Sequence, residues 1–209
     1  IDSLVNAARV VAATGGSTNA ALHLPAIANE AGLKFTLRDV VEIYNSTPYI
    51  GDMQPGGKYV AKDLYDVGGV PVVIKSLLDG GYINGDCITV TGKTIAENHK
   101  EVIFPTNQDV VYKCDNPISE NSSVVGLWGN LAPDGCISKI AGLKNLTFKG
   151  KAKCFDSEED ALTAVLKNEI KAGDAVIIRY EGPKGGPGMR EMLTTTGAIY
   201  GQGPVSYTH

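Results

Sequence analysis

A glycine-rich segment near the C-terminus contains the residue best placed for metal chemistry. The segment runs from Gly182 to Met192 and follows a β-rich stretch at residues 175–180. Its glycines let the backbone approach a ligand closely, and loops of this kind commonly hold ligands. Glu191 is expected in the first turn of the next helix, where the helix dipole favours the ionised carboxylate that Mg²⁺ binds. Glu191 is therefore a candidate magnesium ligand; the alternative is a glutamate that only stabilises its helix.

A second candidate is the string Gly15-Gly16-Ser17-Thr18-Asn19-Ala20, in which two glycines precede an expected helix N-terminus. Backbone N–H groups at such a turn can hold an anion. The alternative is a simple turn in which Ser17 or Thr18 caps the following helix. The string is not a P-loop, because it lacks the Gly-Lys-Ser/Thr ending.

The histidines and one further acid favour structural roles. His23 lies on an apolar helical face and is predicted to be an interior histidine with satisfied hydrogen bonds. His99 follows a short helical segment and is predicted to cap its end. Asp86 follows the turn dipeptide Asn84-Gly85 and is predicted to be solvated. Spacing supports no Ser-His-Asp or Cys-His pairing, so no catalytic residue is assigned within the chain.

The four cysteines do not have the spacing of a metal site. Cys87, Cys114, Cys136 and Cys154 form no C-x-x-C pair, so neither a zinc nor a ferredoxin pattern is present. Their wide spacing also differs from that of small secreted disulfide scaffolds. We expect free, mostly buried thiols in a reducing cytoplasm.

The elements that position these residues change in character along the chain. The first part is predicted to be helical, with a left-handed Gly32 after one helix and a Thr36–Asp39 capping box at the start of the next. The second part is richer in strands, and Ser157 is predicted to cap a helix within it. Helices are expected up to Gly15, from Thr18 to Gly32, and at 37–44, 60–65, 72–78, 158–167 and 189–201; strands are expected at 110–112, 124–128, 136–140, 146–148 and 175–180. The change near residues 101–120 predicts an α/β chain with domains at 1–104 and 105–209.

Composition excludes several classes of function. The chain has 209 residues and a formal net charge of −4, which argues against a nucleic-acid or membrane-surface partner. No apolar run approaches the roughly 20 residues that span a bilayer. The sequence begins at Ile1 without a signal-peptide pattern, so we expect an interior piece of a longer cytoplasmic protein.

Several short strings of residues stand in a fixed order along the chain: Gly15–Ala20, Leu22–Leu24, Gly56–Val60, Gly68–Pro71, Asp86–Thr94, Glu97–Asn98, Asp115–Ile118, Gly129–Gly135, Phe155–Glu159 and Gly182–Leu193. Taken together, these strings resemble the dihydroxy-acid dehydratase and 6-phosphogluconate dehydratase family. The resemblance extends to about Gly203, and the segment Gly182–Leu193 is most similar to the dihydroxy-acid branch.

The resemblance implies a specific reaction. A 2,3-dihydroxy acid would lose water to give a 2-keto acid, as in valine and isoleucine biosynthesis. An iron–sulfur cluster would act as Lewis acid on the departing hydroxyl, Mg²⁺ would hold the substrate, and an ionised serine would take the C2 proton. The resemblance also implies a parent that is a homodimer or a higher homo-oligomer.

Only one of these roles maps onto the chain. Glu191 matches the family's C-terminal magnesium ligand, whereas the cluster cysteines and the other magnesium ligands are expected upstream of Ile1. The base serine is expected downstream of the end, and Ser206 is not that base because its surroundings lack the motif. The piece alone is therefore expected to be inactive.

The resemblance also implies an architecture: the end of an α/β cluster-binding domain, followed by a β-barrel-like swivelling domain with peripheral helices. Two alternatives remain. The parent could be a sugar-acid dehydratase, acting on an aldonate or on 6-phosphogluconate, or the chain could be a non-catalytic interaction or structural domain.

Overall fold

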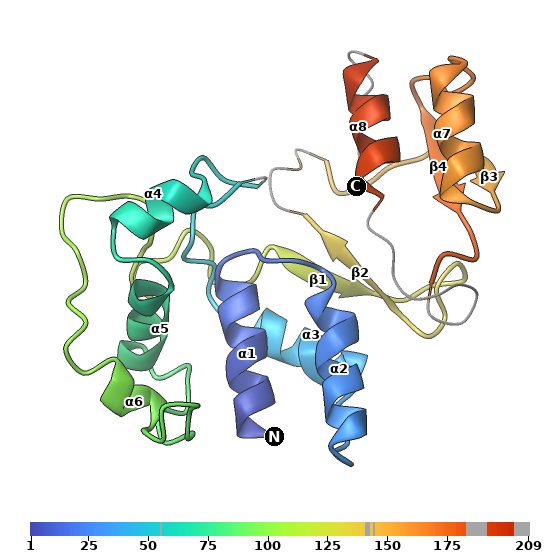
Figure 1. Cartoon of the computed structure of the whole chain (residues 1–209). Coiled ribbons are helices and arrows are strands. Elements are labelled where there is room, and N and C mark those ends of the chain that lie inside the picture. Colours follow the sequence, from blue (N-terminus) through green and yellow to red (C-terminus); the bar gives the residue numbers. More distant parts are fainter. Residues whose placement is uncertain (55, 141–142, 144, 183–191, 203–209) are drawn as a thin grey trace. The chain divides into compact units, whose positions relative to one another are not determined.

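The computed structural model describes residues 1–202 except 55, 141–142, 144 and 183–191, and it contains both helices and strands. The chain divides into two compact units, Ile1–Gly142 and Leu143–His209. In the described part, the strands form one antiparallel and one parallel two-stranded sheet (Figure 1). The α/β content agrees with the sequence prediction, and these sheets do not form a closed barrel.

The first unit begins with three helices around a shared core. Helix α1 (Asp2–Ala13) packs against α2 (Ala20–Glu30) and α3 (Leu37–Asn45) (Figure 1). The predicted capping box opens α3: the Asp39 N–H donates to Thr36 Oγ1 at 3.4 Å, and the Thr36 N–H donates to Asp39 Oδ2 at 2.6 Å. The core contains Ala8, Ala12, Phe35, Val40, Tyr44 and Val124.

A second core of the same unit gathers around helix α5. Helices α4 (Ala61–Asp66), α5 (Val70–Asp79) and the short α6 (Ile95–Asn98) follow one another in the chain. The buried side chains of α5 pack with apolar residues from the long connecting segments. In these segments, Gly51 and Val111 form an isolated antiparallel β-bridge. The core contains Ala13, Ile50, Val72, Val73, Leu77, Ile83, Val110 and Val111.

Strands β1 (Val124–Leu127) and β2 (Cys136–Lys139) belong to the first unit. They pair antiparallel with Val124 opposite Lys139, and Val124 is fully buried in the core beneath α1 and α3. The Ser122 hydroxyl donates to the carbonyl of Ala12 at 3.1 Å, which fixes the start of β1 to α1. These contacts join β1 and β2 to the helices of the first unit, which ends at Gly142. The domain boundary at residues 104–105 stays a prediction, because compactness within this chain does not define the domains of a longer protein.

The second unit is a small β-α-β arrangement with one further helix. Strands β3 (Lys151–Phe155) and β4 (Asp174–Ile178) are parallel, and α7 (Glu158–Leu166) makes the crossover that parallel strands require. The Ser157 hydroxyl accepts from the Asp160 N–H at 3.1 Å, as predicted for this cap. Helix α8 (Leu193–Gly201) packs against α7. The core contains Ala164, Val165 and Ile170.

Several local predictions were wrong. Residues 110–112 and 146–148 form no strand, whereas β3 was not predicted. The side chains of Ser17 and Thr18 do not cap α2, whose N-cap is Asn19. The described part of the final helix begins at Leu193, and its predicted start near Met189 lies outside the described residues.

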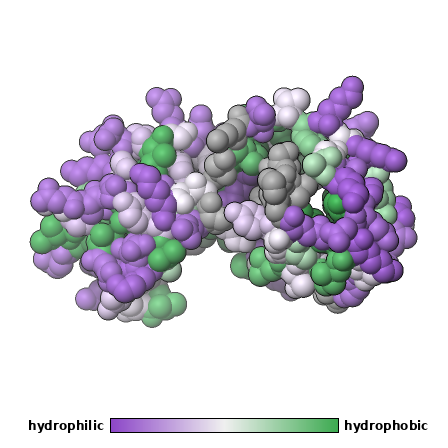
Figure 2. Space-filling view, turned by 90° about the horizontal axis from the view of Figure 1, so that it is seen from above, coloured by the Kyte–Doolittle hydropathy of each residue, from purple (hydrophilic) through white to green (hydrophobic). Residues whose placement is uncertain are grey.

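The described surface is mixed in character. Figure 2 shows a mostly hydrophilic face on which hydrophobic residues are interspersed. Val90, Ile103 and Leu131 are among the exposed large hydrophobic residues. None of the described helices is both long and apolar enough to cross a membrane.

Candidate functional site

A cavity of about 440 Å³ lies beside the Gly15-Gly16-Ser17 turn in the first unit. Its walls come from the end of α1, from this turn, from the segment after Gly51, from α4 and α5, and from β2. The apolar lining consists of Val10, Met53, Leu64, Val70 and Val73, and the polar lining includes Thr14, Ser17, Gln54 and Lys139. Among the residues that the structure describes, the lining therefore combines a largely aliphatic wall with one cationic side chain, that of Lys139.

The glycine N–H groups of the turn complete the end of helix α1. The Gly15 N–H donates to the carbonyl of Ala12 at 3.3 Å, and the Gly16 N–H donates to that of Val11 at 2.9 Å. Gly15 has φ +58, which an L side chain rarely adopts. Both glycine N–H groups are therefore used within the helix end and are not free to bind an anion. The segment forms a turn, as in the alternative, but neither Ser17 nor Thr18 caps α2.

Lys139 supplies the positive charge of the cavity. Its Nζ atom donates to the carbonyl oxygen of Gly16 at 3.3 Å, and the side chain is half-buried. Burial lowers the pKa of Lys139, because desolvation disfavours the ammonium form. No carboxylate of the described residues forms an ion pair with it.

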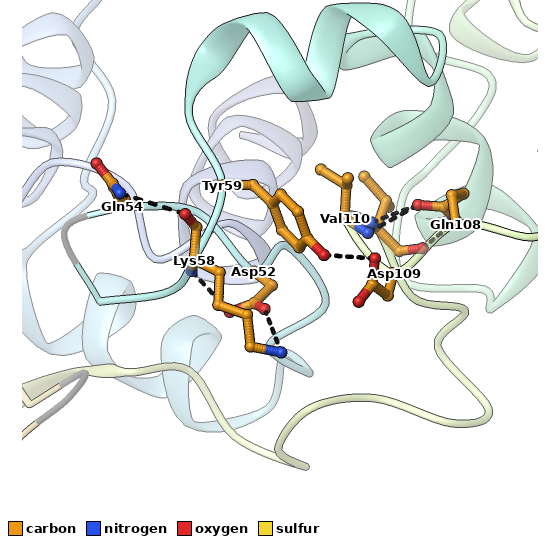
Figure 3. Close-up of polar contacts among 8 residues, drawn as sticks. Asp52, Gln54, Lys58, Tyr59, Gln108, Asp109 and Val110 are labelled. Carbon is orange, nitrogen blue, oxygen red and sulfur yellow. Dashed lines mark hydrogen bonds and ion pairs between the residues drawn. The ribbon is translucent and has the colours of Figure 1, made fainter.

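The segment that carries Met53 and Gln54 is held by a polar network, shown in Figure 3. The Lys58 N–H donates to Asp52 Oδ1 at 3.3 Å, and its Nζ lies 3.6 Å from Asp52 Oδ2. The Gln54 Nε2 group donates to the carbonyl of Lys58 at 3.2 Å. These contacts close the loop on itself and fix the cavity wall that it forms.

The same loop is tied to a distant part of the chain. The Tyr59 hydroxyl donates to Asp109 Oδ1 at 2.5 Å, and Gln108 Oε1 accepts from the N–H groups of Val110 and Val111 at 2.9 Å each (Figure 3). The hydrogen bond to Asp109 is the largest cause that raises the pKa of Tyr59 to about 12. The network therefore positions residues 108–111 beside the loop.

The predicted magnesium ligand Glu191 lies outside the described residues. The described start of its loop follows β4, where Arg179 pairs with Asp156 at 2.5 Å and Tyr180 adopts φ +62. Glu181 Oε1 accepts from the Glu158 N–H at 2.9 Å, so this carboxylate lies at the N-terminus of α7. These contacts anchor the end of β4 to the start of α7.

Three other predictions concern the remaining polar candidates. Asp86 is exposed, and its N–H donates to Asn84 Oδ1 at 3.0 Å, so the solvated turn is confirmed. His99 ends α6, with its Nδ1 2.7 Å from the carbonyl of Ile95. His23 is exposed, so its predicted interior position was wrong for this chain.

The cysteines are free, as predicted, but they are not mostly buried. Cys87 and Cys114 are half-buried, whereas Cys136 and Cys154 are exposed on strands with an open face. No group of three or more His, Cys, Asp or Glu side chains converges within the described residues to hold a metal ion. This part of the chain does not by itself form a cluster or magnesium site.

Sequence reasoning missed Lys139 and the Tyr59–Asp109 pair. Side chains alternate between the two faces of a strand, so Ile137 and Lys139 lie on the same face of β2. Because Ile137 packs against the core, this alternation could have indicated that the Lys139 side chain also faces inward. The Tyr59–Asp109 pair joins positions 50 residues apart, and no local pattern marks such a contact.

Comparison with known proteins identifies the class. Residues 1–98 match the family model described as dihydroxy-acid/6-phosphogluconate dehydratase N-terminal, and residues 109–207 match the corresponding C-terminal model. The two family models match in this order along the chain, with residues 99–108 between them. The chain belongs to the dihydroxy-acid/6-phosphogluconate dehydratase family, as its strings of residues predicted.

Individual relatives carry the name dihydroxy-acid dehydratase. The chain is 66% identical over 201 residues to a protein of this name from Pelagibacter ubique, covering 96% of the chain and 35% of the relative. It is 62% identical over 201 residues to dihydroxy-acid dehydratase 2 from Bradyrhizobium diazoefficiens, with the same coverage of 96% and 35%. The chain therefore spans about a third of the length of these curated relatives.

Proposed function

We propose that the protein carrying this chain is a hydro-lyase that dehydrates 2,3-dihydroxy acids to 2-keto acids in valine and isoleucine biosynthesis. The observation that carries the proposal is the pair of adjoining family matches, together with relatives above 60% identity that are named dihydroxy-acid dehydratase. Fold alone would not support an activity, because related folds carry many functions. Here the likeness is in sequence and covers nearly the whole chain.

The proposed cofactors are an iron–sulfur cluster and Mg²⁺. The described residues do not fit either group, since no three metal-binding side chains converge and the cysteines are dispersed. We infer that segments of the longer protein outside these residues supply the cluster cysteines, the base serine and most magnesium ligands. Within this chain, we assign Glu191 as one magnesium ligand, because a carboxylate is the oxygen donor that this ion prefers.

We also propose a domain organisation. Residues 1–104 would form the end of an α/β cluster-binding domain, and residues 105–209 would belong to a β-barrel-like swivelling domain with peripheral helices. The positions of the two family matches support this division, since they leave only residues 99–108 between them. The parent is expected to be a cytoplasmic homo-oligomer that acts on a small-molecule acid.

The second candidate is a sugar-acid dehydratase. The family description itself favours keeping this candidate, because it also names 6-phosphogluconate dehydratase. The test is to purify the full-length protein anaerobically and to compare turnover of 2,3-dihydroxyisovalerate, 6-phosphogluconate and gluconate. Preferred turnover of 2,3-dihydroxyisovalerate is expected. Preferred turnover of either sugar acid would replace the proposal, and an absence of turnover in iron-loaded protein would contradict both candidates.

A further inference from the structure

The surroundings of Lys139 differ from those of the lysines that form ion pairs. Its Nζ atom lies against the neutral carbonyl of Gly16 at 3.3 Å, and its side chain is half-buried. Lys58 and Lys153, by contrast, each lie close to an aspartate, at 3.6 and 3.3 Å. A carboxylate stabilises the ammonium form of a neighbouring lysine, and within the part of the chain that the structure describes Lys139 has no such partner.

The cavity of about 440 Å³ beside the Gly15–Ser17 turn presents no acidic group to Lys139. Its described lining comes from α1, the turn, the segment after Gly51, α4, α5 and β2, and none of these elements contributes a carboxylate or another titratable side chain to it. The other polar side chains of the lining are the neutral Thr14, Ser17 and Gln54. Desolvation therefore acts on Lys139 without an opposing charge, and burial lowers the pKa of its amine.

A lysine in such surroundings should be a better nucleophile near neutral pH than an exposed one. Only the neutral amine can attack a carbonyl carbon, and less than about 1% of an ordinary lysine is neutral at pH 8. Desolvation in an apolar pocket increases this fraction and so activates the amine. An amide at this position would also be favourable. It carries no charge to desolvate, and its N–H can still donate to the carbonyl of Gly16.

We propose that Lys139 is a modification site that accepts a short acyl group from an acyl phosphate. The neutral Nζ atom attacks the acyl carbon and forms the C–N bond, while the bond from that carbon to the bridging phosphate oxygen breaks. Phosphate leaves with the electron pair, and the nitrogen loses one proton to solvent, so neither an oxidant nor a reductant is needed. The acyl group lies in the cavity against aliphatic side chains such as Leu64 and Val73.

The modification would remove the positive charge that Lys139 contributes to the cavity, while the size and the aliphatic wall of the cavity accommodate the added group. The inference does not rest on the proposed dehydration, because it uses none of the residues or cofactors assigned to that reaction. Its test is a chemical rate at one lysine and does not depend on turnover.

The test uses isotopically labelled acetyl phosphate and the full-length protein, and mass spectrometry of peptides gives the acetylation rate at each lysine. At pH 8, Lys139 should be acetylated at least about fivefold faster than the exposed Lys100 and Lys167, although its own side chain is less accessible. In urea-unfolded protein the three rates should agree within about twofold, because all three amines then have ordinary pKa values.

Two variants separate the cavity from general effects of charge. Gln54→Glu is nearly isosteric at an exposed position of the lining and adds a carboxylate to it. It should favour the ammonium form and slow acetylation of Lys139 at least about threefold. Asn116→Asp adds the same charge at an exposed position outside the lining and should leave the rate unchanged. The proposal is overturned if Lys139 reacts no faster than Lys100 in the folded protein, or if Gln54→Glu and Asn116→Asp give the same rate at Lys139.

Discussion

The Nζ atom of Lys139 lies 3.3 Å from the carbonyl oxygen of Gly16, although the two residues are 123 positions apart in the chain. This hydrogen bond joins β2 to the turn between α1 and α2. Together with burial of Val124, it makes β1 and β2 part of the helical unit. The contact also positions the positive charge at the edge of a cavity whose remaining walls are formed mainly by aliphatic side chains.

Gly15 should tolerate a side chain much less well than Gly32. Both have positive φ, but a Cβ atom at Gly15 would lie 2.8 Å from Ser123 Oγ and 2.9 Å from Tyr49 Cε2, whereas Gly32 has open space. Gly32→Ala should lower the free energy of unfolding by about 1 kcal/mol through backbone strain. Gly15→Ala should lower it by roughly 2 kcal/mol or more, because crowding adds to strain. Urea unfolding measures both, and equal losses would show that the close approach at Gly15 is unimportant.

Thr36→Ala should destabilise α3 by about 1 kcal/mol, as loss of a helix cap usually does. The Thr36 side chain is also the largest cause that lowers the pKa of Asp39. A lowered carboxyl pKa contributes stability at neutral pH that is lost as the pH falls through the folded-state pKa. Thr36→Ala should therefore show less acid destabilisation than the unmodified protein. Glu42→Ala, an exposed change on the same helix, is the control. Equal unfolding free energies for the two variants at neutral pH would argue against the cap.

The Tyr59–Asp109 hydrogen bond predicts a change of stability at alkaline pH. The pKa of Tyr59 is raised from 10.0 to about 12, so its contribution is fully present below pH 10 and is lost as the pH rises toward 12. Asp109→Asn should shift the tyrosinate absorbance titration of this residue toward lower pH. Tyr59→Phe identifies the signal by difference, and Tyr65→Phe, at an exposed position of α4, controls for the loss of one tyrosine. An unchanged Tyr59 titration in Asp109→Asn would rule out the contact as the cause.

Local signals in the sequence were sufficient to predict most of the helices. The Thr36–Asp39 box, the Ser157 cap and the left-handed Gly32 each depend on residues within a few positions, and all three occur as predicted. Short-range hydrogen bonding determines such features, so a single sequence reveals them. The strand Lys151–Phe155 was missed because its alternating lysines have low strand propensity, and its pairing with β4 stabilises it instead.

The candidate site was less predictable, because it depends on contacts between residues that are far apart in the sequence. The turn at Gly15–Ser17 was recognised, but the N–H groups of Gly15 and Gly16 donate to carbonyls of α1. The cavity depends on Lys139, Met53 and Val70, which come from separate segments and meet only in the folded unit. Periodicity within a segment contains no information about which distant segment it will contact. The family resemblance, by contrast, depends on strings of residues and needs no tertiary contact.

The cysteines should differ in their reactivity as thiols. Cys114 is half-buried, burial raises its pKa, and its thiol donates to the carbonyl of Ser76 at 3.3 Å. Because the thiolate is the reactive form, alkylation of Cys114 should be at least about tenfold slower than that of the exposed Cys136 and Cys154. Mass spectrometry of peptides after timed iodoacetamide labelling gives each rate, and urea-unfolded protein provides the reference. Labelling of Cys114 at the rate of Cys136 in the folded protein would contradict its burial.

Glu191→Gln in the full-length protein should preserve the fold and sharply reduce magnesium affinity and turnover. An amide oxygen is a much poorer ligand than a carboxylate for an ion that demands near-octahedral oxygen coordination, so a loss of at least tenfold in apparent magnesium affinity is expected. Glu120→Gln, an exposed glutamate elsewhere in the chain, is the matched control and should behave like the unmodified protein. The magnesium dependence of 2-keto acid formation gives the activity measurement, and Mn²⁺ binding followed by electron paramagnetic resonance gives a measurement independent of turnover. Iron content should be unchanged, because the proposed cluster ligands lie elsewhere in the longer protein. If Glu191→Gln and Glu120→Gln showed the same metal affinity and kcat, Glu191 would be a helix-stabilising residue and its assignment as a magnesium ligand would be wrong.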